Sequence, residues 1–450
     1  LEEGAEMAKR VAEVADGINV RGERYGHRGG LLQPDRLFYP EPPHDLPEDF
    51  DWSRGGKGGA VPLVEAIKAK GVKIPVWTAC RLDPELGEEY LRKGSLDFVG
   101  MTRRLLADPE LPNKAKEGRL EDIRWCHGCL HCFDMRNRNK RLECRINPTL
   151  GRELLPEFQT RMAETKKKVI VIGGGPAGME TARVAAKRGH EVTLYEKAEY
   201  LGGLIPIAAI VKDLESDDLT RFVKYQVAQL DKEGVSVRLK SEATPEIIRS
   251  ENPDVLVIAA GAAHTKIDLP GTERPSFLQT EKLHNTLKFL TRYLAPAQIE
   301  KLSKLWMPVK KRVVVMGGTL HGCELAEFLT KRNRQVVVVH DGPEVELGDK
   351  MTVDDLANLW PWLKQNHVPI WAGVEYRQIT EQGLEINLKD QRKYVLKAQN
   401  IITTQDWQAN DTVVSRFEGL VAETFVIGSC AEPGLIVDAI RDGARIGRAI

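Results

Sequence analysis

The sequence predicts an α/β protein: the C-terminal part of a TIM (β/α)8 barrel, then a cysteine segment, then two Rossmann-like dinucleotide-binding domains. Helical patterns and short apolar strands alternate over residues 1–122, which is typical of a parallel α/β sheet. Four of the seven cysteines fall between residues 126 and 144. A strand–glycine–helix pattern then occurs twice, beginning at residues 168 and 312, and this internal repeat predicts two domains of one kind.

The composition of the chain argues against nucleic-acid-binding and membrane-spanning functions. The 450 residues suffice for two to four domains, and 65 basic residues balance 65 acidic ones, so we expect no nucleic-acid partner. No apolar run approaches the roughly 18 residues of a membrane-spanning helix, so we expect no membrane partner. The cysteine usage predicts a reducing, cytoplasmic location. Both chain ends fall inside helical patterns, and we therefore expect a part of a longer polypeptide.

The first 122 residues carry the predicted part of the barrel. We expect strands at 17–20, 73–78 and 97–101 and helices at 1–15, 60–70 and 83–93. A long segment rich in Pro and Gly follows the first strand, at the end of the strand that builds active sites in β/α barrels. The further boundaries are 123–165 for the cysteine segment and linker, 166–280 with 412–450 for the first dinucleotide domain, and 281–411 for the second.

The cysteine segment has the spacing C-x2-C-x2-C-x11-C, formed by Cys126, Cys129, Cys132 and Cys144. Three thiolates within seven residues can occupy three corners of an iron–sulfur cube, and the fourth can close it. Zinc sites usually present two separated pairs of ligands instead. The spacing favours a 4Fe-4S cluster, with structural zinc and a disulfide knot as the alternatives.

The first glycine pattern directly follows a strand and precedes a helix. Its first glycine permits a tight turn, its second lets a pyrophosphate approach the backbone, and its third lets helix and strand pack closely. The following strand ends in an acid 18 residues beyond the last glycine, where a carboxylate can bind ribose hydroxyls. The residues predicted to bind this dinucleotide are Gly173, Gly175, Pro176, Ala177, Gly178, Glu196 and Lys197.

Further glycines indicate FAD at this first site. The pattern resembles the flavoprotein disulfide reductase family, in which a small-residue turn closes the FAD domain and a late Gly-Asp pair holds the ribityl chain. Here Ser429 stands where many members of the family carry Asp. The resemblance adds Gly203, Leu204, Ala260, Gly261, Gly428 and Ser429 to the FAD site.

The second glycine pattern departs from the fingerprint at its middle position. Thr319 lies between Gly317 and Gly322, so a side chain stands where a pyrophosphate would approach. Asp341, after the next strand, is predicted to bind an NADH ribose, whereas Arg332 or Arg334 would favour a 2′-phosphate. An NAD(P)H site and a vestigial domain both stay open.

Residues 74–81 and 97–109 are similar to the last two barrel strands of the old yellow enzyme family. Together with the cysteine segment and the flavin domain, the architecture resembles the iron–sulfur flavoenzymes of that family, such as 2,4-dienoyl-CoA reductase, 2-enoate reductase and trimethylamine dehydrogenase. The resemblance implies that Arg81, Thr102 and Arg103 bind the FMN phosphate. It also implies a catalytic role for His27, whose imidazole can hydrogen-bond a substrate carbonyl or help to deliver a proton.

The resulting hypothesis is an enzyme that uses NAD(P)H to reduce an activated C=C bond in a small molecule such as an acyl-CoA. Electrons would pass from NAD(P)H through FAD and the cluster to FMN. Two alternatives are an amine dehydrogenase that sends electrons outward and an electron-transfer subunit without catalysis. The sequence leaves open whether the chain pairs with a second copy or with a separate electron-transfer protein.

Overall fold

The structure, a computed structural model, describes residues 2–21, 40, 57–212, 216–265, 267–404 and 407–450. The chain divides into two compact units, Leu1–Gly128 and Cys129–Ile450, and each is considered by itself. No helix in the described ranges is long and apolar enough to cross a membrane.

The first unit contains a parallel three-stranded sheet in the order β1-β2-β3. Its helices alternate with the strands, so the predicted parallel α/β arrangement is confirmed, whereas closure into a barrel stays a prediction. The elements are α1 (Glu2–Val11), β1 (Ile18–Val20), α2 (Val61–Ala69), β2 (Val76–Thr78), α3 (Pro84–Arg92), β3 (Phe98–Val99), α4 (Thr102–Ala107), α5 (Leu111–Lys116) and the 3-10 turn η3 (Leu120–Asp122).

Local chemistry explains where these helices begin. Asp83 caps α3, because its carboxylate accepts a hydrogen bond from the Leu86 amide at 3.0 Å, and Pro84 occupies the first helical position. Pro62 likewise lies in the first turn of α2. The buried faces of α1 and α2 pack with the strands in one apolar core.

The second unit begins with the cysteine segment and continues into a five-stranded parallel sheet in the order β18-β7-β4-β5-β6. The central strands are runs of Val, Ile and Leu, as expected for strands that are covered on both faces. The elements of this part are α6 (His131–Asn137), η4 (Pro156–Phe158), β4 (Lys168–Ile172), α7 (Pro176–Lys187), β5 (Glu191–Tyr195), α8 (Ile205–Val211), α9 (Ser216–Lys232), β6 (Ser236–Arg238), α10 (Pro245–Glu251), β7 (Val255–Ile258), α15 (Asp411–Val414), η7 (Ser415–Phe417), β18 (Glu423–Val426), η8 (Gly428–Cys430) and α16 (Ile436–Ala449).

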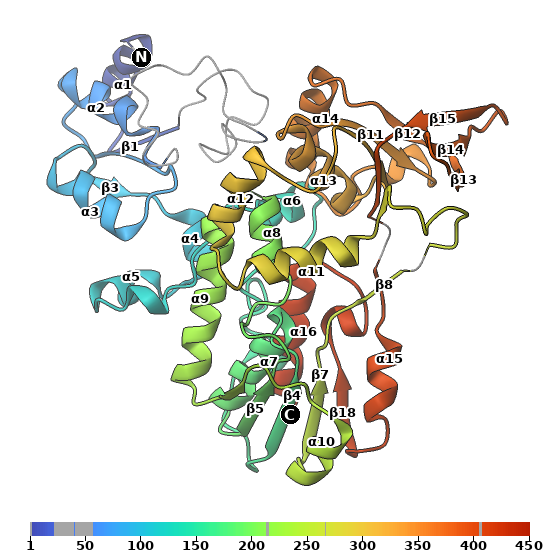
Figure 1. The fold of residues 1–450 in the computed structure, drawn as a ribbon. Helices are drawn as coiled ribbons and strands as arrows, with labels where there is room; N and C mark the ends of the chain where they lie inside the picture. Colours follow the sequence, from blue (N-terminus) through green and yellow to red (C-terminus); the bar gives the residue numbers. More distant parts are fainter. Residues whose placement is uncertain (1, 22–39, 41–56, 213–215, 266, 405–406) are drawn as a thin grey trace. The chain divides into compact units, whose positions relative to one another are not determined.

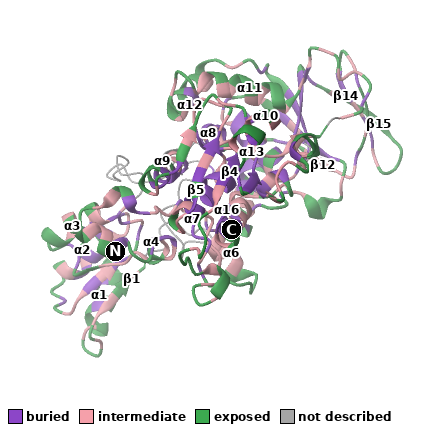
Figure 2. Cartoon of the chain, turned by 90° about the horizontal axis from the view of Figure 1, so that it is seen from below, coloured by how far each residue is buried: buried purple, intermediate pink, exposed green. Residues whose placement is uncertain are grey.

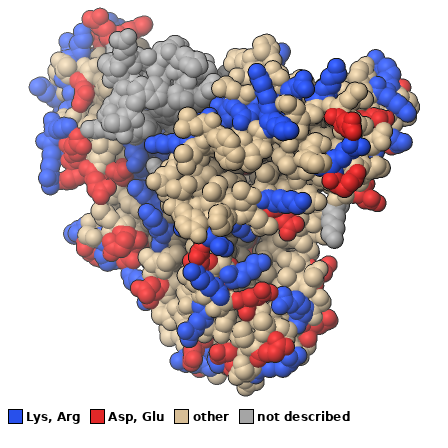
Figure 3. All heavy atoms as spheres, in the orientation of Figure 1, with Lys and Arg blue, Asp and Glu red and all other residues tan. Residues whose placement is uncertain are grey.

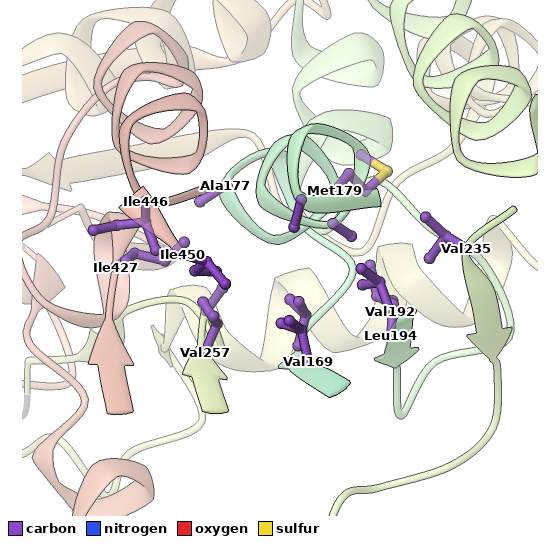
Figure 4. Close-up of a cluster of buried hydrophobic side chains, with 14 of the residues drawn as sticks. Val169, Ala177, Met179, Val192, Leu194, Val235, Val257, Ile427, Ile446 and Ile450 are labelled. Atoms are coloured by element: carbon purple, nitrogen blue, oxygen red, sulfur yellow. The ribbon is translucent and has the colours of Figure 1, made fainter. Parts of the chain in front are cut away.

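Helices α7 and α16 cover one face of this sheet (Figure 1). Val169, Leu194 and Val257 point from the strands toward α7 and form the main core with it (Figure 4). Gly443 lets α16 approach, because an added Cβ would overlap the Ala177 carbonyl oxygen. Buried residues are concentrated on these strands and helices (Figure 2). The sheet and its two helices therefore form a rigid platform for the first glycine turn.

A second five-stranded parallel sheet, in the order β12-β11-β10-β16-β9, lies in the same unit. A three-stranded antiparallel sheet, β13-β14-β15, shares an apolar core with it. The elements are β9 (Phe277–Leu278), β10 (Arg312–Met316), α13 (Leu320–Thr330), β11 (Gln335–His340), η6 (Glu344–Glu346), α14 (Val353–Gln365), β12 (Ile370–Ala372), β13 (Glu375–Ile379), β14 (Gly383–Asn387), β15 (Lys393–Lys397) and β16 (Asn400–Thr403). Strand β9 thus belongs to the second sheet, although the sequence placed residues 277–278 in the first domain.

The chain passes between the two sheets along a short antiparallel ribbon of β8 (Ala263–His264) and β17 (Trp407–Gln408). Two helices, α11 (Thr280–Leu290) and α12 (Pro296–Leu305), follow the outgoing strand and contact α8. A salt bridge of 3.0 Å between Lys212 and Glu324 also joins the two domains. Basic and acidic side chains are interspersed on the face that Figure 3 shows, which is typical of a solvated surface.

Candidate functional site

The first glycine turn has the geometry that the sequence predicts. Gly173 has φ 106°, a left-handed conformation that glycine adopts without strain. An added Cβ at Gly178 would overlap the carbonyl oxygen of Gly173, so the close packing of turn and helix requires glycine at this position. At Gly175 an added Cβ would meet no atom within 4 Å. The middle glycine therefore faces open space at the N-terminus of α7, where a pyrophosphate can bind.

The carboxylate of Glu196 lies beside this turn. Its two oxygens accept hydrogen bonds of 2.7 Å from the amides of Gly174 and Ala198. Gly203, with φ 60°, also approaches, since an added Cβ would lie 3.2 Å from the Gly175 Cα atom. The predicted acid and the Leu201–Gly203 turn thus adjoin the phosphate turn.

The late glycine joins the same edge of the sheet. Gly428 has φ 57°, and an added Cβ would lie 2.7 Å from the Cβ atom of Ala177. Asn410 links the neighbouring loops, because its amide nitrogen donates to the Gly261 carbonyl at 3.1 Å and its backbone amide donates to the Cys430 carbonyl at 2.9 Å. The structure therefore brings the predicted FAD residues together, including the Gly428–Cys430 turn that contains Ser429.

The second turn repeats the backbone of the first. Gly317 has the same φ of 106°, and an added Cβ at Gly322 would overlap the Gly317 carbonyl oxygen. Thr319 has φ −78° and ψ −169°, against −78° and 179° for Gly175. The Thr319 hydroxyl does not cap the helix. A threonine therefore occupies the middle position without distorting the turn.

The residue that matches Glu196 in this second domain is His340. Each residue follows the first glycine of its turn by 23 positions. The Gly318 amide donates to His340 Nδ1 at 3.4 Å, in the way that Gly174 donates to Glu196. Asp341, which the sequence predicted for this role, is the next residue and is exposed. The spacing from Gly317 would have identified His340.

The prediction for the two arginines is wrong. Arg332 and Arg334 lie just before β11, at the opposite end of the strand from His340. Arg332 is buried and donates to the Phe328 carbonyl at 2.9 Å. Arg334 donates to the Val309 carbonyl at 3.0 Å. Both side chains hold the fold together and are not placed to bind a 2′-phosphate.

Two cysteines of the segment, Cys129 and Cys132, lie near Cys144. Burial raises the pKa of Cys144 to about 11, and nearby Cys129 and Cys132 add to the rise. Backbone amides of Ile146 and Asn147 donate to the same sulfur. Thiolates that lie this close need a compensating cation, and amide donors to sulfur are typical of iron–sulfur ligands.

The division between the two units falls between Cys126 and Cys129. In the first unit, the Gly128 amide donates to the Cys126 sulfur at 3.4 Å. No group of three or more His, Cys, Asp or Glu side chains in the described ranges is arranged to hold a metal ion. Ligation by the four cysteines therefore stays a prediction, which the donor types and the environment of Cys144 support.

A charged group anchors the cysteine segment to the first dinucleotide domain. Glu143 binds Arg152, and Arg441 of α16 approaches the Glu143 carboxylate at 3.4 Å. Burial opposes ionisation of Glu143, but the hydrogen bond and charge of Arg152, with Arg441, hold its pKa below the usual value. Asp134 of α6 accepts a hydrogen bond of 3.1 Å from the Val353 amide in the second domain. The segment is thus bonded to both domains.

In the first unit, two predicted FMN residues, Thr102 and Arg103, begin helix α4 directly after β3. Arg81 follows the neighbouring strand β2 and has φ 53°. Arg104, which the sequence analysis did not single out, joins the two loops, since its guanidinium donates to the Leu82 and Arg81 carbonyls at 2.6 and 3.1 Å. The predicted catalytic His27 lies outside the described residues.

A histidine–tryptophan cluster, also missed from the sequence, lies at the ribbon between the domains. Its members are His264, His284, His321 and Trp407. His264 and Trp407 are cross-strand partners with ring centroids 4.1 Å apart, and His284 stacks on Trp407 at 5.6 Å with an interplanar angle of 9°. His321 lies in the second glycine turn, with its ring 6.4 Å from that of Trp407. The cluster thus connects the ribbon to the second nucleotide turn.

Comparisons with known proteins agree with this arrangement. The NADH oxidase of Thermoanaerobacter brockii is 32% identical over 99% of this chain and 63% of its own length. The cinnamate reductase of Clostridium sporogenes is 29% identical over 100% of this chain and 62% of its length. The solved structure of a 2-naphthoyl-CoA reductase in complex with 2-naphthoyl-CoA matches 99% of this chain and 62% of its own, with 26% identity and a TM-score of 0.81.

The chain therefore spans less than two thirds of the length of each of these relatives. They include reductases of the kind that the sequence was predicted to resemble, so that prediction is confirmed. The family model described as pyridine nucleotide-disulphide oxidoreductase matches residues 167–443, which contain both glycine turns. The chain belongs to the pyridine nucleotide-disulphide oxidoreductase family.

Proposed function

We propose that this chain is part of an NAD(P)H-dependent flavin and iron–sulfur oxidoreductase that reduces an activated C=C bond in an enoyl-, dienoyl- or aryl-CoA or a 2-enoate. The observation that carries the proposal is the second glycine turn. Its backbone matches the first turn although Thr319 replaces the middle glycine. A turn of this form can receive a dinucleotide at the N-terminus of α13. The relatives, an NADH oxidase and two reductases, support the same direction of electron flow.

The residues of the two turns would bind and orient the nucleotides. Gly175 leaves room for the FAD pyrophosphate, and Glu196 lies beside the turn where the FAD ribose would bind. Thr319 can donate its hydroxyl to a phosphate oxygen of NAD(P)H. When bound, FAD, a 4Fe-4S cluster and FMN would allow the two electrons of a hydride to be transferred one at a time and used again as a pair. Cys126, Cys129, Cys132 and Cys144 would hold the cluster.

In the first unit, Arg81, Thr102 and Arg103 would hold the FMN phosphate at the carboxyl ends of two neighbouring strands. The four cysteines would have to stay reduced to bind a cluster, and a reducing, cytoplasmic location would keep them so. The substrate is proposed to be a small molecule, with a second copy or a separate electron carrier as the protein partner.

The full-length parent protein, purified without oxygen, tests the proposal. We expect one FAD, one FMN and about four iron atoms per chain for the proposed set of groups. NADH or NADPH should bleach the flavin absorbance, and cinnamate or an enoyl-CoA should restore it. A protein that contains these groups but is not reduced by either nicotinamide nucleotide would contradict the proposal.

The Thr319 side chain favours one alternative function. It stands at the position where a pyrophosphate approaches the backbone most closely, and a weak second site would suit an amine dehydrogenase that sends electrons outward. Replacing Thr319 by Gly separates the two functions. A reductase should keep or improve its NADH affinity in the Thr319→Gly variant. An amine dehydrogenase should be reduced by its amine and not respond to NADH, and ADP in place of FAD at the first turn would further identify it.

A further inference from the structure

The first two turns of α16 are bonded to two segments that are distant from each other in sequence. One is the cysteine segment, at Glu143, which directly precedes Cys144. The other is the flavin turn, by which we mean residues 428–435, and it contains the predicted FAD residues Gly428 and Ser429. Charged side chains of α16 make both sets of bonds, so the helix is a candidate link between the two sites.

Two carboxylates of α16 hold the two ends of the flavin turn. The Gly428 amide donates a hydrogen bond of 3.2 Å to Asp442 Oδ2. The Leu435 amide donates a hydrogen bond of 2.9 Å to Asp438 Oδ2. A turn that is bonded at both ends has fewer conformations to lose when a ligand binds. The two carboxylates therefore prepare the backbone around Ser429 for FAD.

Arg441 joins the flavin turn to the cysteine segment. Its Nη2 atom donates to Asp438 Oδ1 at 2.6 Å, and its Nη1 atom lies 3.4 and 3.5 Å from the two Glu143 carboxylate oxygens. Glu143 also binds Arg152, so that four charges of alternating sign form one row. The guanidinium directs two nitrogens at two different carboxylates, which the single ammonium group of a lysine does not do.

Helix α16 is fixed on the helix that begins at the first glycine turn. An added Cβ at Gly443 would overlap the Ala177 carbonyl oxygen, and one at Gly447 would lie 2.9 Å from the Thr181 carbonyl oxygen. Both carbonyls belong to α7, which starts at Pro176. Close packing of this kind leaves α16 little freedom to shift when a contact at its N-terminal end is lost. The glycine turn, α7, α16 and the flavin turn thus act as one body.

We propose that Arg441 is a positioning residue that couples FAD binding to the placement of the cysteine segment. FAD at the first glycine turn favours the arrangement in which the flavin turn is bonded to Asp438 and Asp442. Asp438 in turn keeps Arg441 directed at Glu143, which holds the residues beside Cys144 against the first dinucleotide domain. Such a coupling is reciprocal, so a held cysteine segment also strengthens FAD binding. The inference rests on the proposed function, which assigns FAD to the first turn.

Limited proteolysis of the full-length parent by trypsin, with and without FAD and at equal iron content, tests the coupling. When opening is fast, the cleavage rate reports how often the segment detaches. In the wild-type protein, FAD should slow cleavage within residues 129–165 at least about fivefold. In Arg441→Met, FAD should slow this cleavage less than about twofold, and FAD should bind about fivefold more weakly in calorimetric titration. Equal protection by FAD in both proteins would overturn the inference.

The Arg441→Lys variant distinguishes the bridge from a general effect of charge. It keeps the positive charge but lacks the two directed nitrogens, so FAD should protect its cysteine segment no better than in Arg441→Met. Full protection in the lysine variant would contradict the bridging role. The wild-type protein decides the question even if both variants fail to fold, because a cleavage rate that FAD leaves unchanged would also overturn the inference.

Arg416→Met is the matched control. It removes an exposed ion pair with Glu242 in the same dinucleotide domain, and it should keep the protection by FAD and the FAD affinity of the wild-type protein. The outcomes also separate the two proposals. If FAD protects the segment but NADH and NADPH do not reduce the flavin, the proposed function fails and the coupling stands. If a nicotinamide nucleotide reduces the flavin but FAD does not affect the cleavage, the coupling fails and the function stands.

Discussion

At the residue scale, the glycines of one turn serve different purposes. A side chain at Gly178 would collide with the backbone of the turn, whereas a side chain at Gly175 would enter open space. Gly175 also has a backbone conformation that any residue can adopt. One glycine is therefore required by the fold and the other by the ligand.

This difference predicts that one alanine substitution lowers the stability of the protein and the other weakens FAD binding. Gly178→Ala should destabilise the protein by about 2–4 kcal/mol, because the backbone must move to remove the overlap. Gly175→Ala should change the stability of the apoprotein by less than about 1 kcal/mol and weaken FAD binding by more than about tenfold. Urea unfolding of the apoprotein and fluorescence titration with FAD measure the two quantities. Equal losses of stability would show that the middle glycine also has a structural role.

Single residues were predicted well where spacing reflects a backbone constraint. Glu196 could be found because the turn, the helix and the next strand have a fixed combined length. The same count leads to His340, but the preference for an acid at this position directed the prediction to Asp341. The histidine–tryptophan cluster could not be predicted, since its members come from segments that are distant from one another in sequence. Arg332 was misassigned because a charged residue near a site in sequence can lie at the opposite end of a strand.

At the element scale, charged contacts join the cysteine segment to the first dinucleotide domain. Glu143 is the centre of these contacts, and its side chain is only 16% exposed. Two arginines approach it, Arg152 from the segment and Arg441 from α16. Breaking a largely buried ion pair leaves an unpaired charge behind, which costs more than the loss of a surface pair.

Glu143→Gln should therefore destabilise the protein by about 1–3 kcal/mol and make residues 129–165 more susceptible to limited proteolysis. The matched control is Glu242→Gln, which removes an exposed pair with Arg416 and should cost less than about 0.5 kcal/mol. Urea unfolding and mass analysis of the fragments provide the measurements. If both variants lose the same small amount, the contacts of Glu143 do not anchor the segment.

Elements with a strong local signal were predicted close to their observed bounds. Strands β4 and β10 are short runs of Val and Ile next to glycine turns, and both begin where the sequence predicted a strand. Strand β9 has only two residues and is defined by its partner β16, so no local pattern reveals it. The antiparallel sheet was also not anticipated, because its outer strands are largely exposed and polar.

At the scale of the whole molecule, the histidine–tryptophan cluster makes the junction between the domains sensitive to acid. Burial, together with the positive charges of His264, Lys288 and His321, lowers the pKa of His284 from 6.5 to about 4. As the pH falls through this range, the unfolded chain takes up a proton before the folded chain does. Stability therefore falls with the pH between these two pKa values, by on the order of 3 kcal/mol for this one group.

The variant His284→Phe should reduce this loss while it keeps an aromatic ring against Trp407. Urea unfolding at about pH 7 and about pH 4.5 should show a smaller difference in the free energy of unfolding for the variant than for the wild-type protein. His367→Asn is the control, because His367 is exposed and its left-handed backbone (φ 54°) suits Asn. An unchanged pH dependence in His284→Phe would show that other groups determine the acid sensitivity.

The ribbon of β8 and β17 has a consequence for protein engineering and for the evolution of the two domains. The chain leaves the first domain and returns to it through two paired strands, with His264 directly opposite Trp407. The second domain is thus an insertion whose two ends lie side by side, an arrangement that tolerates excision or replacement. A short loop that joins these two strands could leave the first nucleotide sheet complete. A different domain could be inserted between the same two strands. Insertion at this ribbon is also a simple evolutionary route from one dinucleotide-binding domain to two.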